Sequence, residues 1–309
     1  MMIRTKTAPF LRTEESVGSM MRDMLLALAA LLILPTVHYG VSVLKLAAVS
    51  VAACMLAEIA GCLVAKREIN ISELSPMVTG MVIAAMMPPG APYWLPAAAG
   101  AFAVLAARMP FGSIGHTPFN PAAAGLAFAT AFWPGEMFRY AQQSPAAALK
   151  AGLKPEAVPS EMLWGLTAGP VGTTAALVIA ACSLFLFVRR AANWQIPFWF
   201  LVSAAVFAAL FPRILVPPFT SVKYEMLSGS LLFCAVFMMT DPVTAPRTVS
   251  GGALYGLLGG IVLMLMRRFG VYEQSASFTV LLMNAAAPLI DGAVCSLQAE
   301  RRRGREKEE

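Results

Sequence analysis

Long apolar runs, separated by short polar breaks or by Gly and Pro, dominate the pattern of this chain. An apolar segment of about 17 to 25 residues can cross a bilayer as a helix, because every backbone group is then hydrogen-bonded within the segment. Ten segments fit or approach this pattern: 24–43, 44–65, 77–88, 93–107, 120–133, 170–188, 195–211, 226–239, 253–266 and 278–296. The sequence therefore predicts an all-α membrane protein with about ten transmembrane helices.

Several of these segments are too short for a full crossing and are bounded by Gly and Pro rather than by charges, notably 77–88, 120–133 and 226–239. Such segments are typical of the broken helices of transporters. The run G-S-I-G-H-T at 112–117 is echoed by G-P-V-G-T-T at 169–174. With five segments in each half, the two halves are expected to be repeats inverted in the membrane.

Composition narrows the class of protein. Of the 309 residues, 58% are hydrophobic and 13% are charged, and the mean hydropathy is +0.70. A soluble domain usually carries about a quarter charged residues, so an ordinary soluble enzyme is excluded. The net charge of +6 does not indicate a nucleic-acid binder, because basic residues that flank apolar spans report membrane topology and contact with lipid headgroups.

The distribution of Lys and Arg predicts the orientation. Ten crossings place both termini on one side, and that side collects most of the basic residues, including five in the last nine positions. By the positive-inside rule both termini are cytoplasmic. Arg267 and Arg268 are expected in a loop on the outer side of the membrane, which is an exception to the cytoplasmic excess of Lys and Arg. The prediction is a single membrane domain over 1–309, with a cytoplasmic segment at 1–23, an outer loop at 134–168 and a charged cytoplasmic tail at 297–309.

Acidic residues inside or beside the spans are few. Glu58 lies in the middle of the second segment, where an isolated carboxylate costs several kcal/mol unless it pairs, faces the bundle interior or stays protonated. It is predicted either to line an ion pathway or to be a structural acid near the interface. Asp241 is a second, weaker ion-pathway residue, whereas Asp291 is expected to be structural. The five cysteines form no C-x-x-C pair, and no metal site or catalytic residue is predicted.

Two stretches contain helix-break motifs. In F-G-S-I-G-H-T-P-F-N-P-A-A-A-G, at 111–125, Asn120 can cap a helix that begins at Pro121, and Gly112 and Gly115 allow close approach of the backbone. The N–H groups at such a start favour a phosphate or carbonyl of a cofactor. In M-M-T-D-P-V-T-A-P-R-T, at 238–248, Asp241 is again expected as an N-cap, and Gly251–Gly252 as a further break. The alternative for both stretches is an ordinary helix end.

Five blocks in order carry a resemblance to a known family. They are S-P-M-V-T-G-M-V-I-A-A-M-M-P-P-G-A-P-Y-W, the 111–125 stretch, N-W-Q-I-P-F-W-F-L, F-M-M-T-D-P-V-T-A-P and S-F-T-V-L-L-M-N-A-A-A-P-L-I-D-G. Together they resemble the D subunit of Rnf electron-transport complexes, which is homologous to the B subunit of the sodium-pumping NADH:quinone oxidoreductase. The resemblance runs from Ser75 to Gly292. It implies a multi-pass subunit of a bacterial inner-membrane complex, in contact with the other subunits, that couples electron transfer between ferredoxin and NAD to movement of sodium ions or protons.

The family also implies a flavin. Its members carry FMN joined to a Thr or Ser of the outer loop, within a pattern that resembles D-x-x-S-G-A-T-P. Here the loop reads R-Y-A-Q-Q-S-P-A-A-A-L-K, so Ser144 takes the acceptor position, while the Asp and the Gly-Ala are missing. The block at 111–125 departs too, with Ser113 for a Gly and Thr117 for an Asn. The resemblance therefore implies either FMN joined covalently to Ser144 or a non-covalently bound FMN or riboflavin.

Two further classes remain open. The chain could be a solute channel or transporter without redox chemistry, because inverted five-helix repeats with few acids suit the permeation of neutral solutes. It could instead be a scaffold subunit of the same fold that has lost its flavin. Flavin fluorescence of the purified protein on a denaturing gel discriminates these alternatives from a covalent redox carrier.

Overall fold

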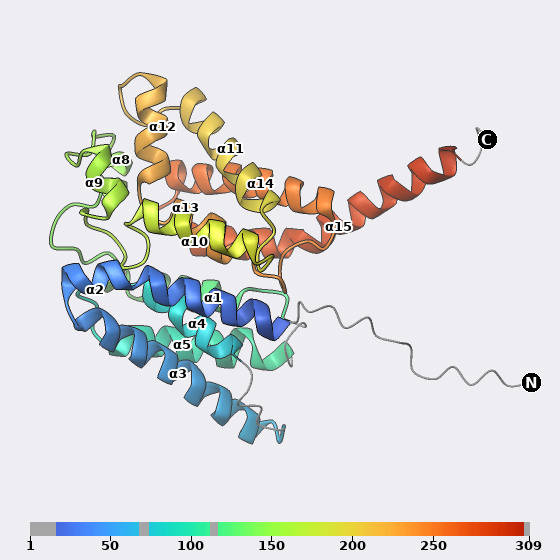
Figure 1. Ribbon diagram of the computed structural model, residues 1–309, viewed down its shortest axis with the longest axis horizontal. Helices are drawn as coiled ribbons and strands as arrows, with labels where there is room; N and C mark the ends of the chain where they lie inside the picture. The colour runs from blue at the N-terminus through green and yellow to red at the C-terminus, as the bar shows by residue number, and fades with distance from the viewer. Residues whose placement is uncertain (1–16, 68–73, 112–116, 306–309) are drawn as a thin grey trace, which may run out of the picture.

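The computed structural model describes residues 17–67, 74–111 and 117–305, and these residues form helices and connecting segments without a β-strand. Figure 1 shows two groups of helices, one built from the first part of the chain and one from the last part. The first helix begins and the last helix ends at the same end of the bundle, here called the terminal end. Helices α8 and α9 lie at the opposite end, here called the loop end.

The first group consists of helices α1 to α6. Its helices are α1 (Val17–Leu31), α2 (Ile33–Tyr39), α3 (Ser42–Val64), α4 (Ser75–Ala85), α5 (Trp94–Ala107), the 3-10 turn η1 (Met109–Phe111) and α6 (Pro121–Phe132). Helix α6 begins as its sequence predicts: the Asn120 side chain accepts a hydrogen bond from the Ala123 N–H at 3.2 Å, and Pro121 occupies the first position.

The loop predicted at 134–168 contains three short helices, α7 (Pro134–Met137), α8 (Pro145–Lys150) and α9 (Pro159–Trp164). Each begins with Pro, whose fixed φ suits the first helical position. Their polar surfaces and the connecting segments form the loop end of the molecule.

The second group contains the remaining helices. They are α10 (Ala176–Val188), α11 (Gln195–Leu210), α12 (Pro218–Leu227), α13 (Leu231–Phe233), the π-helical segment η2 (Cys234–Met238), α14 (Val249–Phe269) and α15 (Ala276–Arg305). The α15 helix continues through much of the segment predicted as a charged tail, to Arg305. Likewise α1 begins at Val17, inside the segment predicted as a non-membrane N-terminus.

Five helices of the described residues are long and apolar enough to cross a membrane: 17–39, 42–64, 94–111, 249–269 and 276–298. A sixth span is formed if α12 and the α13–η2 segment are taken together, bent by 66°. The other predicted segments correspond to shorter apolar helices, α4, α6, α10 and α11. The chain is thus an all-α, multi-pass membrane protein in which full-length spans alternate with short and broken helices.

Close helix packing depends on small residues. A Cβ on Gly80 of α4 would lie 2.6 Å from Cα of Val51 in α3, and a Cβ on Gly100 of α5 would lie 2.8 Å from Sγ of Cys54. Such contacts let backbones approach each other, which is how helices associate in lipid. In the second group, Gly256 and Gly260 of α14 face the α11 backbone in the same way.

Three sequence predictions about this region were wrong. No helix begins at Asp241; its carboxylate accepts hydrogen bonds from the Val243 N–H and the Thr244 hydroxyl in a turn, and α14 begins later with Thr248 as its cap. Gly251 and Gly252 lie inside α14 rather than breaking it. Arg267 and Arg268 also lie inside α14, where Arg267 is buried, so the pair is not a loop charge that opposes the topology.

Candidate cofactor and ion site

A small pocket opens at the terminal end of the bundle, between the two groups of helices. Its apolar lining includes Met20, Met21, Met24, Val78, Val82 and Phe237. Its polar lining consists of Ser75, Thr79, Arg108, Thr117, Asn120 and Asp241. An apolar pocket with a few convergent polar groups is typical of a small-molecule or cofactor site. We call it the terminal pocket.

Asn120 connects the wall of this pocket to the centre of the bundle. Its backbone N–H donates to Oδ1 of Asn284 in α15 at 2.9 Å, and its Nδ2 donates to the Met238 carbonyl at 3.4 Å. The Nδ2 group of Asn284 in turn donates to the Tyr255 hydroxyl at 3.0 Å. All three side chains are buried, so this network fixes α6, α14 and α15 against the end of η2.

Glu58 is ion-paired rather than isolated. Its Oε2 lies 3.1 Å from Nε of Arg108, and the two side chains are 16% and 3% exposed. The Arg108 guanidinium also donates to the Ser75 hydroxyl at the start of α4. A buried carboxylate is compensated by such a partner, as the sequence required. Of the pair, Arg108 lines the terminal pocket and Glu58 lies behind it.

Asp241 lies on the opposite wall of the terminal pocket from α4, in the turn that follows η2. Burial raises the pKa of its carboxyl, while the hydrogen bonds from Val243 and Thr244 and the positive charge of Arg108 act to lower it. The pocket therefore places a buried acid and a guanidinium in one lining, an arrangement that is common at functional sites.

The η2 segment adds a second unusual feature to this wall. Five residues, Cys234–Met238, adopt a π-helix, a conformation that is rare and often found at functional sites. Phe237 of this segment lines the terminal pocket. The Met238 carbonyl, which accepts from Asn120, lies at its end. The broken span and the Asn120–Pro121 helix start therefore meet at the pocket.

Ser144 does not lie in this pocket; it is at the loop end, where it begins α8. Its hydroxyl accepts from the Ala147 N–H at 3.0 Å and donates to Oε2 of Glu273 at 2.7 Å, and the residue is 2% exposed. Both hydrogen-bonding functions of the hydroxyl are thus engaged inside the protein. A buried N-cap of this kind does not fit a phosphoester to FMN unless α8 unwinds. The geometry of Ser144 therefore does not support covalent FMN at this residue.

The remaining predicted residues have separate places. Gly112 and Gly115 lie outside the described residues. Asp291 accepts hydrogen bonds from the Thr248 hydroxyl at 2.7 Å and the Arg247 N–H at 2.8 Å, a structural role at the start of α14. Cys54, Cys62, Cys182 and Cys234 are buried and Cys295 is exposed, and none is disulfide-bonded. No cluster of His, Cys, Asp or Glu that could hold a metal occurs within the described residues.

Two residues of the site are not predicted by the sequence pattern. Arg108 looks like a loop charge, although it directly follows an apolar segment and a mid-span acid elsewhere needs a partner. Asn284 is inconspicuous inside L-L-M-N-A-A-A-P, although a lone Asn in a span commonly bonds another helix. Neither sequence feature identifies its residue as part of the site, because the contact partner, Glu58 for Arg108 and Asn120 for Asn284, is known only from the structure.

Comparison with known proteins agrees with this architecture. The NQR2, RnfD, RnfE family matches residues 4–298. The chain is 31% identical to the D subunit of the Na(+)-translocating ferredoxin:NAD(+) oxidoreductase complex of Acetobacterium woodii, over 94% of this chain and 92% of the relative. It is 30% identical to the D subunit of the ion-translocating oxidoreductase complex of Halorhodospira halophila, over 92% and 91%.

A third relative has a different named ion. The D subunit of the proton-translocating ferredoxin:NAD(+) oxidoreductase complex of Clostridium ljungdahlii is 27% identical over 92% of each chain. The fold and the pocket thus define a polytopic membrane protein with short and broken helices around a small pocket. The chain belongs to the NQR2, RnfD, RnfE family, as its five sequence blocks predicted.

Proposed function

We propose that this chain is the D-type membrane subunit of an Rnf-type complex, which couples electron transfer between ferredoxin and NAD to translocation of sodium ions or protons across a bacterial inner membrane. The observation that carries the proposal is the terminal pocket, in which Asn120, Arg108 and Asp241 converge on an apolar hollow beside a broken span. Relatives of similar length bear names of such subunits, and this supports the assignment of the pocket to redox-coupled transport.

We also propose that the chain crosses the membrane ten times, in two inverted halves with cytoplasmic termini. The packing supports this: α3 packs on α5 and α5 on α6, while α11 packs on α14 and α14 on α15. If α1 and α2 count as one crossing, and α12 with α13–η2 as another, the fourth crossing of each half ends at a buried arginine. These residues are Arg108, directly after α5, and Arg267 in α14. One lies at the terminal end and the other near α8 at the loop end, as inversion requires.

The lining of the terminal pocket suits a non-covalent flavin, and the pocket must widen to admit the ring. Methionine, valine and phenylalanine side chains offer apolar surface for a planar ring, while Asn120, Thr79 and Thr117 offer hydrogen bonds at its edges. A bound flavin supplies one- and two-electron transfer, and the protein's part is to hold and orient it. Arg108 provides positive charge that favours an electron-rich ligand, and the three methionines of α1 contribute apolar surface to one wall.

The ion pathway is assigned to the same hollow. Glu58 is held by Arg108, and Asp241 is held by hydrogen bonds within its turn, so the two acids flank one guanidinium. Negative charge added to a ligand in the pocket favours uptake of a cation by a neighbouring carboxylate. Asp241, which is not in a short ion pair among the described contacts, is the stronger candidate for that carboxylate, and Glu58 the second.

The test is the flavin content of the purified complex, measured after acid precipitation so that free and covalent flavin separate. We expect flavin in the supernatant and no fluorescent band for this chain on a denaturing gel. Val78→Trp, which fills the terminal pocket, should reduce the released flavin at least fivefold relative to Val206→Trp, a matched change at an exposed position of α11.

Other outcomes identify the alternatives. A fluorescent band that disappears in Ser144→Ala would establish a covalent carrier at the loop end. Complete absence of flavin from an assembled, active complex would favour the scaffold, an interpretation that the engaged Ser144 hydroxyl also supports. Solute flux without any effect of electron donors would favour the channel.

A further inference from the structure

The broken span has a hinge at its loop end. Helix α12 and the α13–η2 segment are bent by 66°, and Gly229, in the three residues between them, has a φ of +60°, which favours glycine. A Cβ at Gly229 would lie 3.1 Å from a terminal nitrogen of Arg267 and 3.3 Å from the Ala146 Cβ of α8. The hinge is therefore enclosed by α14 on one side and by the outer-loop helix on the other.

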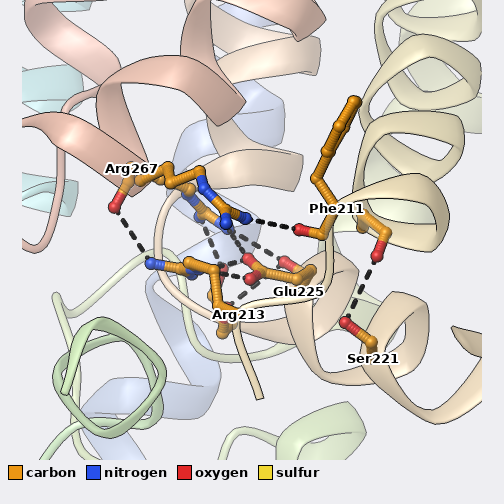
Figure 2. Close-up of polar contacts among 8 residues, drawn as sticks. Phe211, Arg213, Ser221, Glu225 and Arg267 are labelled. Carbon is orange, nitrogen blue, oxygen red and sulfur yellow. Dashed lines mark hydrogen bonds and ion pairs between the residues drawn. The ribbon is translucent and has the colours of Figure 1, made fainter. Parts of the chain in front are cut away.

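Arg213, Glu225 and Arg267 form a buried charge network beside this hinge (Figure 2). Glu225 of α12 receives two hydrogen bonds from Arg213, at 2.5 and 2.7 Å, and one from Arg267 at 3.3 Å. Arg267 also donates to the Ser228 carbonyl at 2.8 Å and the Glu225 carbonyl at 3.0 Å. Arg213 donates to the Arg267 carbonyl at 3.1 Å, so that three segments are joined.

These three side chains are almost completely buried, at 9% for Arg213, 1% for Glu225 and 2% for Arg267. Buried charges cost desolvation, and well-packed apolar side chains often stabilise a fold as well or better. Stability alone therefore does not explain the network. When water enters, separated charges are stabilised by hydration, whereas separated apolar side chains are not. A network of charges can therefore open and close more readily than an apolar contact.

The two ends of the same span differ in access. The short α13–η2 segment leads from the network to Phe237 and then to Asp241, both in the lining of the open terminal pocket. At the other end, the hinge carbonyl of Ser228 is held by Arg267 and Ser228 itself is 1% exposed. The span thus borders an open pocket at the terminal end, whereas its loop end is buried and held by hydrogen bonds.

We propose that Arg213, Glu225 and Arg267 form a loop-end gate, which closes the broken span against the loop side while the terminal pocket is open. This rests on the ion-translocating function proposed above. Separation of Glu225 from the two guanidiniums frees the Ser228–Ser230 hinge, and the α13–η2 segment then swings away from α15. Arg267 and Glu225 act as positioning residues, since they touch the hinge rather than the transported ion.

Cys234 provides a natural reporter of this gate. It lies one helical turn beyond the hinge, where its N–H donates to the Ser230 carbonyl at 2.8 Å, and its side chain is 0% exposed. The assay uses the complete complex in sealed vesicles of known orientation, with the other four cysteines replaced by Ala. A charged, membrane-impermeant methanethiosulfonate is added to either side. Labelling needs neither flavin nor electron donor, so its failure is separable from failure of the proposed function.

The closed gate should leave Cys234 unlabelled in the parent protein. Glu225→Gln leaves two guanidiniums without their counter-charge, and we expect Cys234 labelling from the loop side to rise at least tenfold above labelling from the terminal side. Passive sodium or proton leak through the vesicles should increase in parallel. Glu136→Gln, which breaks an exposed pair with Arg139 at 3.5 Å in the same outer region, should change neither rate.

A second variant guards against misfolding. Arg213→Met keeps the Glu225–Arg267 contact and should raise loop-side labelling by a smaller factor than Glu225→Gln. If Glu225→Gln fails to assemble, Arg213→Met decides the matter. Assembled variants with an unreactive Cys234, or with equal labelling from both sides, would overturn the gate, because the first result means that the path stays closed and the second that the bundle has merely loosened.

Discussion

Two acids at the loop end differ in how their charge is compensated. Glu225 has two arginines within hydrogen-bonding distance. Glu273 has the Ser144 hydroxyl on Oε2, while its Oε1 is buried without a hydrogen-bond partner. Burial consequently raises the pKa of Glu273 above its ordinary value of 4.5, although Ser144 and the charge of Lys150 act to lower it. The acid that follows α14 thus has a raised pKa and hydrogen-bonds the predicted flavin acceptor, Ser144.

A pH dependence of stability follows for Glu273. As pH rises above the pKa of the unfolded chain, the unfolded state loses this proton while the folded state retains it, so stability falls until the pH passes the raised folded pKa. The Gln side chain of Glu273→Gln does not titrate, so the melting temperature of this variant should rise relative to that of the parent as the pH rises above the ordinary pKa of 4.5. Thermal unfolding of the detergent-purified complex measures this difference.

The control for this experiment is Glu156→Gln, which alters an exposed acid in the same outer region. Its melting temperature should follow that of the parent at every pH. A gap between Glu273→Gln and the parent that stays constant with pH would contradict the role assigned to Glu273.

At the scale of elements, the glycines of α14 determine how closely it packs on α11. Gly252, Gly256 and Gly260 recur every four residues, and a Cβ at Gly256 would collide with the Ile196 carbonyl of α11. Backbone cannot move aside as a flexible side chain can, so the two helices would have to separate. The same spacing of small residues is a recognised contact motif for helices in lipid.

Gly256→Ala should therefore destabilise the protein by about 1–3 kcal/mol, the usual cost of overpacking. Gly292→Ala in α15 is the matched change, because a Cβ there meets no atom within 4 Å. The measurement is the thermal stability and yield of the assembled complex for both variants. Equal behaviour of the two variants would refute the packing role of Gly256.

At the scale of the whole molecule, the two ends carry different chemistry. The terminal end has the pocket with Asp241 and Arg108, whereas the loop end has the gate and the Ser144–Glu273 pair. In Figure 1 the start of α1 and the end of α15 lie toward the same end of the molecule, opposite α8 and α9. The ion translocation proposed above requires such a difference between the ends, because ion entry and exit must occur on different faces.

The predicted orientation can be tested by sided labelling in a cysteine-free background. Lys154→Cys, in the outer loop, should react with an impermeant maleimide added to whole cells. Gln298→Cys, near the end of α15, should react only after the membrane is permeabilised. Both positions are exposed, so accessibility to the reagent is limited by sidedness alone. Labelling of the two positions from the same side would contradict the placement of α8 and the C-terminus on opposite faces.

The sequence alone determined the class, the family and the start of α6. Apolar runs must become helices in lipid because no other partner exists for their backbone, and Asn120–Pro121 starts a helix through purely local bonds. Tertiary structure decided what lies opposite each polar residue. Glu58 meets Arg108 from a helix about fifty positions away, and Glu225 meets Arg267 from another helix, contacts that no local pattern encodes.

The three wrong predictions, about Asp241, Gly251–Gly252 and Arg267–Arg268, have the same cause. Asp241–Pro242 and Gly251–Gly252 look like a helix start and a helix break by their local propensity, but the turn at Asp241 and the packing of α14 on α11 override it. Arg267 looks like a loop charge until Glu225 is placed beside it. Ser144 looks like an open acceptor until α8 and Glu273 enclose it. Partners brought from distant segments, through desolvation and hydrogen bonding, decide what these polar groups do.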